Sequence, residues 1–135
     1  MTVFLFQETN KIAQDINRAK NFAISVQSWQ DQKPCGYGVY FDKDNRQYII
    51  FTEIASNCAW APHRRGSQGS IDIETHPLPK FLSFKTINFQ EVFFLPPDPL
   101  VLFSPDVTTG EIVFQTSSGL TQTIKIYKTG QVTAF

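Results

Sequence analysis

Hydrophobic and polar positions between residues 9 and 29 repeat with the period of an α-helix. Apolar residues recur at steps of four, three, four and three, which places on one helical face Ile12, Ile16, Ala19, Ala23 and Val26. Polar residues fall mostly on the other faces, where water is expected, and include Lys11, Gln14, Asn17, Arg18, Asn21 and Ser25. Thr9 and Asn10 are residue types that cap helix N-termini. The pattern predicts an amphipathic helix over residues 9–30 whose apolar face packs on a sheet.

After residue 35 the chain has the pattern of short strands separated by turn residues. Alternation on either side of the turn at 42–46 predicts a hairpin. Further strands are expected at 70–74, 81–87, 91–95, 110–116 and 121–127, with shorter ones at 100–103 and 131–135. We therefore predict an α+β fold in a single domain, 1–135, in which one N-terminal α-helix packs on an antiparallel β-sheet and the β-rich part occupies residues 35–135.

The first eight residues have a different character, because residues 1–6 are apolar. Six residues are far too few to cross a bilayer. Two interpretations are open: the segment is the end, or stub, of a longer apolar stretch, or it is a first strand or frayed end.

Composition narrows the function classes. Twelve basic and twelve acidic residues cancel, which argues against a broad nucleic-acid-binding surface. The sequence contains no nucleophile elbow, no phosphate-binding loop, no dinucleotide fingerprint and no zinc-protease motif. We expect that the protein is not an enzyme and that it has no cofactor, no metal site and no small-molecule substrate. A thiol or metal-dependent hydrolase that uses Cys35 with His63 or His76 is the remaining catalytic alternative.

The two cysteines, Cys35 and Cys58, allow two interpretations. An even count at this separation is typical of a single disulfide in an exported protein. The alternative is a pair of unrelated buried thiols. A zinc site is not expected, because His63 and His76 lack ligand-like spacing to the cysteines.

Two regions are candidates for surface contacts. The first is the long irregular segment 53–69. Its Trp60 could stack on a sugar, and its basic residues His63, Arg64 and Arg65 could bind an anion, DNA or an acidic surface. Lys125 and Lys128 form a second, weaker basic region near the C-terminus. The alternative for the basic groups is a solvated loop tip, and for Trp60 a residue that anchors the loop.

Four stretches follow one another in a specific order: residues 12–23, 36–42, 94–99 and 124–132. The set resembles the type IV pilin-like proteins, in particular the minor pilin and pseudopilin branch of type IV pili and type II secretion systems. In that family a helix of the pattern L-x-x-D-L-x-R-A-x-x-x-A leads into a β-domain, and the residues that fit it are Asp15, Ile16, Arg18, Ala19 and Ala23. A closing strand of the pattern V-x-x-x-G-x-V is matched by Ile126, Gly130 and Val132.

The resemblance implies a pilin-like head domain and a structural role in a filament or pseudopilus. Its partners would be other pilin or pseudopilin subunits and the assembly machinery. It also implies a leader, a processing site and about twenty apolar residues ahead of the amphipathic helix, so that the protein is anchored in the membrane before assembly and lies at the cell surface afterwards. Some relatives in this branch bind DNA through arginines near the C-terminal strands, whereas the matching region here has only Lys125 and Lys128, so DNA binding is not expected.

A second function from another class is a secreted or surface β-rich module that binds glycan or protein ligands, with the helix as a packing element. Loss of glycan binding in a Trp60→Ala variant would favour it over the filament subunit.

Overall fold

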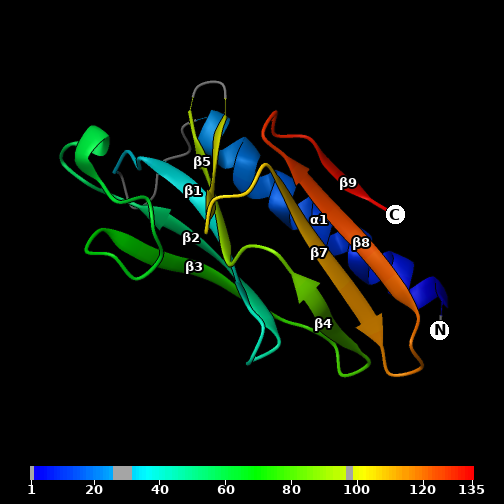
Figure 1. The fold of residues 1–135 in the computed structure, drawn as a ribbon. Helices are drawn as coiled ribbons and strands as arrows, with labels where there is room; N and C mark the ends of the chain where they lie inside the picture. The colour runs from blue at the N-terminus through cyan, green and yellow to red at the C-terminus, as the bar shows by residue number, and fades with distance from the viewer. Residues whose placement is uncertain (1, 26–31, 97–98) are drawn as a thin grey trace.

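A computed structural model describes residues 2–25, 32–96 and 99–135 (Figure 1). Over these residues the chain forms one long helix, one short 3-10 turn and nine strands. In chain order their bounds are α1 Thr2–Ile24, β1 Gly36–Asp42, β2 Gln47–Glu53, η1 Cys58–Trp60, β3 Ser70–Pro77, β4 Leu82–Ile87, β5 Glu91–Leu95, β6 Leu100–Ser104, β7 Thr109–Thr116, β8 Thr121–Tyr127 and β9 Val132–Ala134.

The strands form two antiparallel sheets. One has five strands in the order β3-β2-β1-β5-β6, and the other has four in the order β4-β7-β8-β9. The β1–β2 hairpin pairs Gly36 with Glu53 and Asp42 with Gln47, as expected for a hairpin closed by the turn at 42–46. In that turn Arg46 donates from Nη2 to the carbonyls of Pro79, at 2.9 Å, and Leu82, which ties the hairpin to the start of the second sheet.

The predicted fold class, a pilin-like α+β domain with a long helix on an antiparallel sheet, is wrong. The chain is mostly β, with 46% strand and 19% helix, and its strands divide into two sheets. Alternation along one strand shows which side chains share a face, but it does not show which strand is the neighbour. Here β4 pairs with β7, which follows it by more than twenty residues, and with no strand of the five-stranded sheet.

The helix also begins earlier than predicted. It starts at Thr2, so that most of the predicted stub, residues 1–8, is helical. Thr9 is buried inside the helix, where its hydroxyl donates to the carbonyl of Leu5 at 2.8 Å, and it does not cap the N-terminus. Leu5 is buried seven residues before Ile12 and so extends the same apolar face by two turns. The described helix ends at Ile24; the predicted end at residue 30 lies outside the described residues.

The apolar face of α1 lies in the core between elements of both sheets. Ile12, Ile16, Ala19 and Ala23 are fully buried, while Val26 lies outside the described residues. The helix contacts β1 and β5 of the five-stranded sheet and β8 and β9 of the four-stranded sheet. In Figure 1 it runs diagonally beside all four of these strands. One helical face therefore contributes to covering two sheets.

The two sheets also meet directly, through aromatic rings. Phe41 on β1 lies 6.2 Å from the ring of Phe84 on β4 and 5.5 Å from Phe89, both in edge-to-face geometry. Such pairs contribute about 1 kcal/mol each beyond the area they bury. Phe89 in turn lies 5.1 Å from Phe103 on β6. The core is continuous from one sheet to the other.

We predict that Ile16→Asp destabilises the domain by several kcal/mol, because it places an unpaired carboxylate on the face of α1 that both sheets cover. Urea unfolding followed by circular dichroism measures this loss. Gln14→Asp is the matched control, since Gln14 is exposed on the same helix and should leave the free energy of unfolding within about 0.5 kcal/mol of wild type. Equal stability of the two variants would contradict the packing of α1.

Candidate functional site

A disulfide joins Cys35, just before β1, to Cys58 at the start of η1. The prediction of a bridge is confirmed, and the alternative of two separate thiols is excluded. The sulfur atoms are 2.04 Å apart and the Cα atoms 5.3 Å apart. The bridge holds the first half of the segment between β2 and β3, residues 54–69, against the end of the five-stranded sheet. We refer to this segment as loop 54–69.

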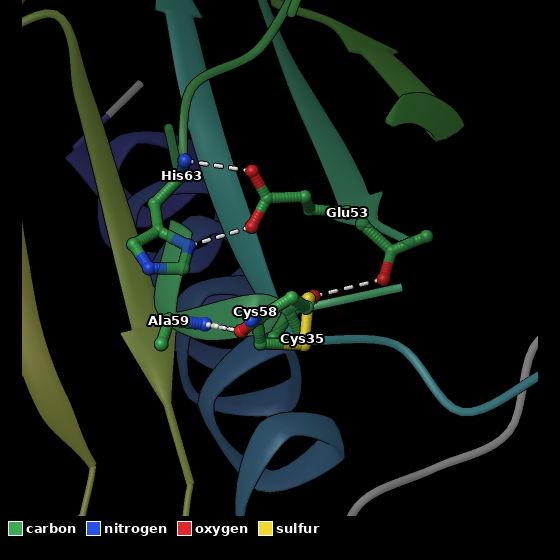
Figure 2. Close-up of a disulfide and its surroundings, with 8 residues drawn as sticks. Cys35, Glu53, Cys58, Ala59 and His63 are labelled. Atoms are coloured by element: carbon green, nitrogen blue, oxygen red, sulfur yellow. Dashed lines mark hydrogen bonds and ion pairs between the residues drawn. A yellow bond between two sulfur atoms is a disulfide. The ribbon is translucent and has the colours of Figure 1, made fainter. Parts of the chain in front are cut away.

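A buried carboxylate holds the middle of the same loop (Figure 2). Glu53, the last residue of β2, is fully buried. Its Oε2 accepts the backbone N–H of His63 at 2.6 Å, and its Oε1 lies 2.6 Å from Nδ1 of the same histidine. The Glu53 carbonyl also accepts the N–H of Cys35 at 2.7 Å. One residue thus positions both the disulfide and the loop, and both carboxylate oxygens that burial removes from water have partners.

His63 is further fixed by an aromatic contact. Its ring stacks on Phe93 of β5 with centroids 5.2 Å apart, and Phe93 lies 5.8 Å from Phe51 of β2. His63 has a backbone φ of 57°, in the left-handed region that non-glycine residues seldom adopt. The bidentate contact with Glu53 compensates for this conformation. Loop 54–69 therefore covers an aromatic patch on the face of the sheet opposite α1.

A second buried carboxylate, Glu91 at the start of β5, holds the next two residues of the loop. It accepts Nε of Arg64 at 3.1 Å and the backbone N–H of Arg65 at 3.0 Å. The Arg65 guanidinium makes two bonds to Asp72, at 2.9 and 2.7 Å, and lies 4.7 Å over the ring of Tyr40. Each of the three basic residues of the loop thus has an acidic partner in this chain.

The predicted surface contacts of the loop included binding of an anion, DNA or an acidic surface by His63, Arg64 and Arg65. In the structure these three side chains contact acidic residues of the same chain. These side chains hold the loop on the sheet, and only Arg64 has a half-exposed side chain. Sequence reasoning missed Glu53 and Glu91. Their signal was an acidic residue within or beside a strand of buried apolar residues, which requires a partner of opposite charge or a hydrogen-bond donor.

Trp60 has the opposite environment, because it is the most exposed large apolar residue of the described chain, at 85%. It closes η1, whose N-cap is Asn57: the Asn57 side chain accepts the N–H of Ala59 at 3.0 Å. Trp60 is one of the residues that line an open groove of about 450 Å³; the others among the described residues are Glu53, Ile54, Ala55, Ser56, Asn57, Ala61, Pro62, Gln68 and Gly69. The structure therefore gives no packing role to this tryptophan.

The second basic region, Lys125 and Lys128, is also engaged within the chain. Lys125 Nζ is 3.8 Å from Glu111 Oε2 and lies over the ring of Phe135 at 5.2 Å. Lys128 Nζ is 3.0 Å from Asp106 Oδ1. These contacts are at the surface, where an ion pair is worth little. A contact of either lysine with a partner stays a prediction.

A polar cluster that the sequence did not reveal anchors α1 to the five-stranded sheet. Asp15 accepts the hydroxyl of Tyr48 at 2.6 Å and Nη2 of Arg18 at 3.0 Å. Arg18 makes two further bonds to Glu74 of β3, at 2.5 and 2.6 Å, and His76 Nε2 lies 2.7 Å from Glu74 Oε1. Arg18 had been assigned to the solvent-facing side of the helix, and the structure corrects this. Asp15 and Arg18 are two of the residues that carry the family resemblance.

The charges of this cluster stabilise one another. The hydrogen bonds from Arg18 lower the pKa of Glu74 to about 2, with His76 acting in the same direction. Burial, together with the bond to Asp15, raises the pKa of Tyr48, which keeps its hydroxyl protonated as a donor. The cluster thus holds α1 at a fixed position on β2 and β3.

The thiol form of the catalytic alternative requires a free cysteine. Both cysteines are in the disulfide, so neither thiol is available to act as a nucleophile. No group of three or more His, Cys, Asp or Glu side chains among the described residues is arranged to hold a metal ion. No helix formed by those residues is both long and apolar enough to span a bilayer.

Comparison with protein-family models, with curated proteins and with solved structures gave no match for the chain.

Removal of the disulfide tests how much it stabilises the loop. The bridged residues are 23 positions apart, and closing a loop of this size contributes about 3 kcal/mol in the chain-entropy model. We expect the Cys35→Ser/Cys58→Ser double variant to lose about that much free energy of unfolding and to be cleaved faster by protease within loop 54–69. Reduced wild-type protein should behave like the variant. An unchanged unfolding curve would show that Glu53 and Glu91 hold the loop without the bridge.

The lowered pKa of Glu74 predicts a pH dependence of stability. The carboxylate is favoured in the folded state, so its contribution is present above the unfolded pKa of about 4.5 and is lost as the pH falls towards 2. We expect Glu74→Gln to lower the free energy of unfolding by about 1 kcal/mol at pH 7, the scale of a half-exposed pair, and to flatten the loss between pH 4.5 and 2. Asp44→Asn is the control, because Asp44 lies exposed in the β1–β2 turn. Identical pH profiles for wild type and Glu74→Gln would contradict this assignment.

Proposed function

We propose that this protein is a structural subunit of an extracellular filament of the type IV pilus or type II secretion kind, and that it acts by assembly through α1. The observation that carries the proposal is the contrast along this helix. From Ile12 to Ala23 its apolar face is buried under both sheets, whereas near its N-terminus Phe4 and Phe6 are 57% and 48% exposed. On an α-helix residues 4 and 6 do not share a face, so the two rings flank the buried Leu5 on either side. We take these exposed rings at one end of α1 as its contact with a neighbouring subunit.

The polar anchor supports a helix that transmits load to the rest of the domain. Asp15 and Arg18 fix α1 to Tyr48 and Glu74, so that a force applied at its N-terminal end reaches the five-stranded sheet through ion pairs and hydrogen bonds as well as apolar contacts. A filament subunit needs this rigid connection between the packing helix and the outer domain. The resemblance to pilin-like proteins, in which Asp15 and Arg18 take part, adds to this support.

The disulfide agrees with the proposed location at the cell surface, because such bridges persist in oxidising compartments and are rare in the cytosol. The proposed partners are other subunits of the filament and its assembly machinery, with anchoring in the membrane before assembly. The proposal depends on α1 and the disulfide, and the division of the strands into two sheets does not alter it.

Substitution of the exposed aromatics tests the proposal. We expect Phe4→Asp/Phe6→Asp to leave the melting temperature within a few degrees of wild type, since each position is about half exposed and the new carboxylates reach water. The amount of the subunit in sheared filaments should fall at least about tenfold. The measurement is an immunoblot of sheared filaments from cells that carry the substituted gene in place of the native one.

Leu100→Asp is the matched control, because Leu100 is 58% exposed and lies at the start of β6, outside α1. It should enter filaments like wild type. Filaments that contain the Phe4→Asp/Phe6→Asp variant at the wild-type level, or a wild-type protein that never enters a filament, would count against the proposal.

A further inference from the structure

The groove beside Trp60 combines one exposed ring with uncharged polar groups. Ser56, Asn57 and Gln68 line it together with small and apolar residues. The side chains of Ser56 and Gln68, and Nδ2 of Asn57, have no hydrogen-bond partner among the described residues. Ligand sites of this size are lined mainly by apolar surface with a few polar groups that orient the ligand. The groove has this composition.

The backbone that carries Trp60 is held in place before any ligand arrives. The disulfide holds one end of η1, the Asn57 cap holds its backbone, and the N–H of Ile54 donates to the carbonyl of Gly69 at 2.9 Å across the base of the loop. A tryptophan has only two side-chain torsions, so little further entropy is lost when it is covered. Preorganisation of this kind favours binding.

Charge decides between the classes of ligand. Among the described residues that line the groove, Glu53 is the one ionisable residue, and both of its carboxylate oxygens are engaged by His63. The nearby arginines, Arg64 and Arg65, have partners in Glu91 and Asp72. A nucleic acid, a phosphate or an acidic polymer would find no free cation among the described residues of this groove wall. The available chemistry is a flat apolar ring beside hydroxyl and amide groups.

We infer that this groove binds a neutral glycan, with the apolar face of one sugar ring stacked on Trp60 and its hydroxyl groups bonded to Gln68, Ser56 and Asn57. Indole offers a large apolar face to the C–H groups of a pyranose, while amides and hydroxyls match its alternating donors and acceptors. The site is separate from the exposed aromatics of α1, so the inference does not rest on assembly into a filament.

The test is titration of the folded chain with uncharged oligosaccharides, followed by amide chemical-shift changes in NMR spectra. The probes are cellohexaose, chitohexaose, maltohexaose and mannohexaose, at up to about 5 mM so that weak, millimolar affinities are detected. A heparin hexasaccharide is the anionic comparison. We expect at least one neutral probe to bind and to shift the amides of loop 54–69, and the heparin probe to leave them unchanged.

Three variants assign the binding to the groove. Trp60→Ala should weaken it at least about tenfold, with an unchanged melting temperature because the side chain is 85% exposed. Gln68→Ala should weaken it severalfold through the loss of one bond to a hydroxyl. Phe135→Ala removes another exposed ring, at the C-terminus, and should bind like wild type.

The inference is overturned if none of the neutral probes binds, if Trp60→Ala binds as tightly as wild type, or if the heparin probe alone shifts the loop. Phe4→Asp/Phe6→Asp should retain glycan binding, so that failure of filament assembly and failure of this site give different results.

Discussion

The apolar face of α1 is the constraint on which the rest of the structure depends. Neither sheet can bury its inner surface by itself, and the helix supplies a row of small and branched residues that elements of both sheets contact. Ala19 and Ala23 allow close approach, while Ile12 and Ile16 fill the space between the layers. Each fully buried isoleucine stabilises the fold by about 2 kcal/mol relative to an exposed one. Loss of the helix would expose the core at its centre.

Loop 54–69 covers part of the outer face of the five-stranded sheet, as α1 covers part of its inner face. Rings of Phe51 and Phe93 lie there, and Glu53 and Glu91 are buried beside them. A loop cannot cover such a surface with apolar side chains alone, because its own backbone groups need partners. The two glutamates provide acceptors for the N–H groups of His63 and Arg65 as well as for the basic side chains. The buried charges are therefore the means by which an irregular segment packs on a sheet.

The sequence predicted well those features that depend on neighbours along the chain. The period of four and three located the buried residues of α1, and the turn at 42–46 located the first hairpin. It predicted poorly the features that depend on distant partners. Thr9 has the chemistry of a cap, yet Leu5 and Ile12 share a face, so the helix continues through it. The pairing of β4 with β7, and of Arg64 with Glu91, joins residues that are far apart in the sequence.

At the candidate site, too, some features could be predicted from the sequence and others could not. The cysteines could be identified by residue type, since a cysteine pair has few structural roles, and the disulfide is present. Trp60 is exposed, and its contact role stays a prediction. The basic residues could not be interpreted, because a cation in a loop has the same sequence pattern whether it faces solvent or a buried carboxylate. An acidic residue in an apolar strand is the stronger signal, since burial without a partner costs far more than exposure of a cation.

The arrangement of the two proposed surfaces makes them compatible. In Figure 1 the N-terminal end of α1 lies at one side of the molecule and the segment that contains η1 lies at the other, with the sheets between them. A subunit held by Phe4 and Phe6 would therefore keep Trp60 free. Both surfaces are attached to the five-stranded sheet by specific contacts. Asp15 and Arg18 fix the helix to this sheet, and Glu53 and the disulfide fix the loop to it. The five-stranded sheet is thus the element through which a contact at one end is mechanically connected to a contact at the other.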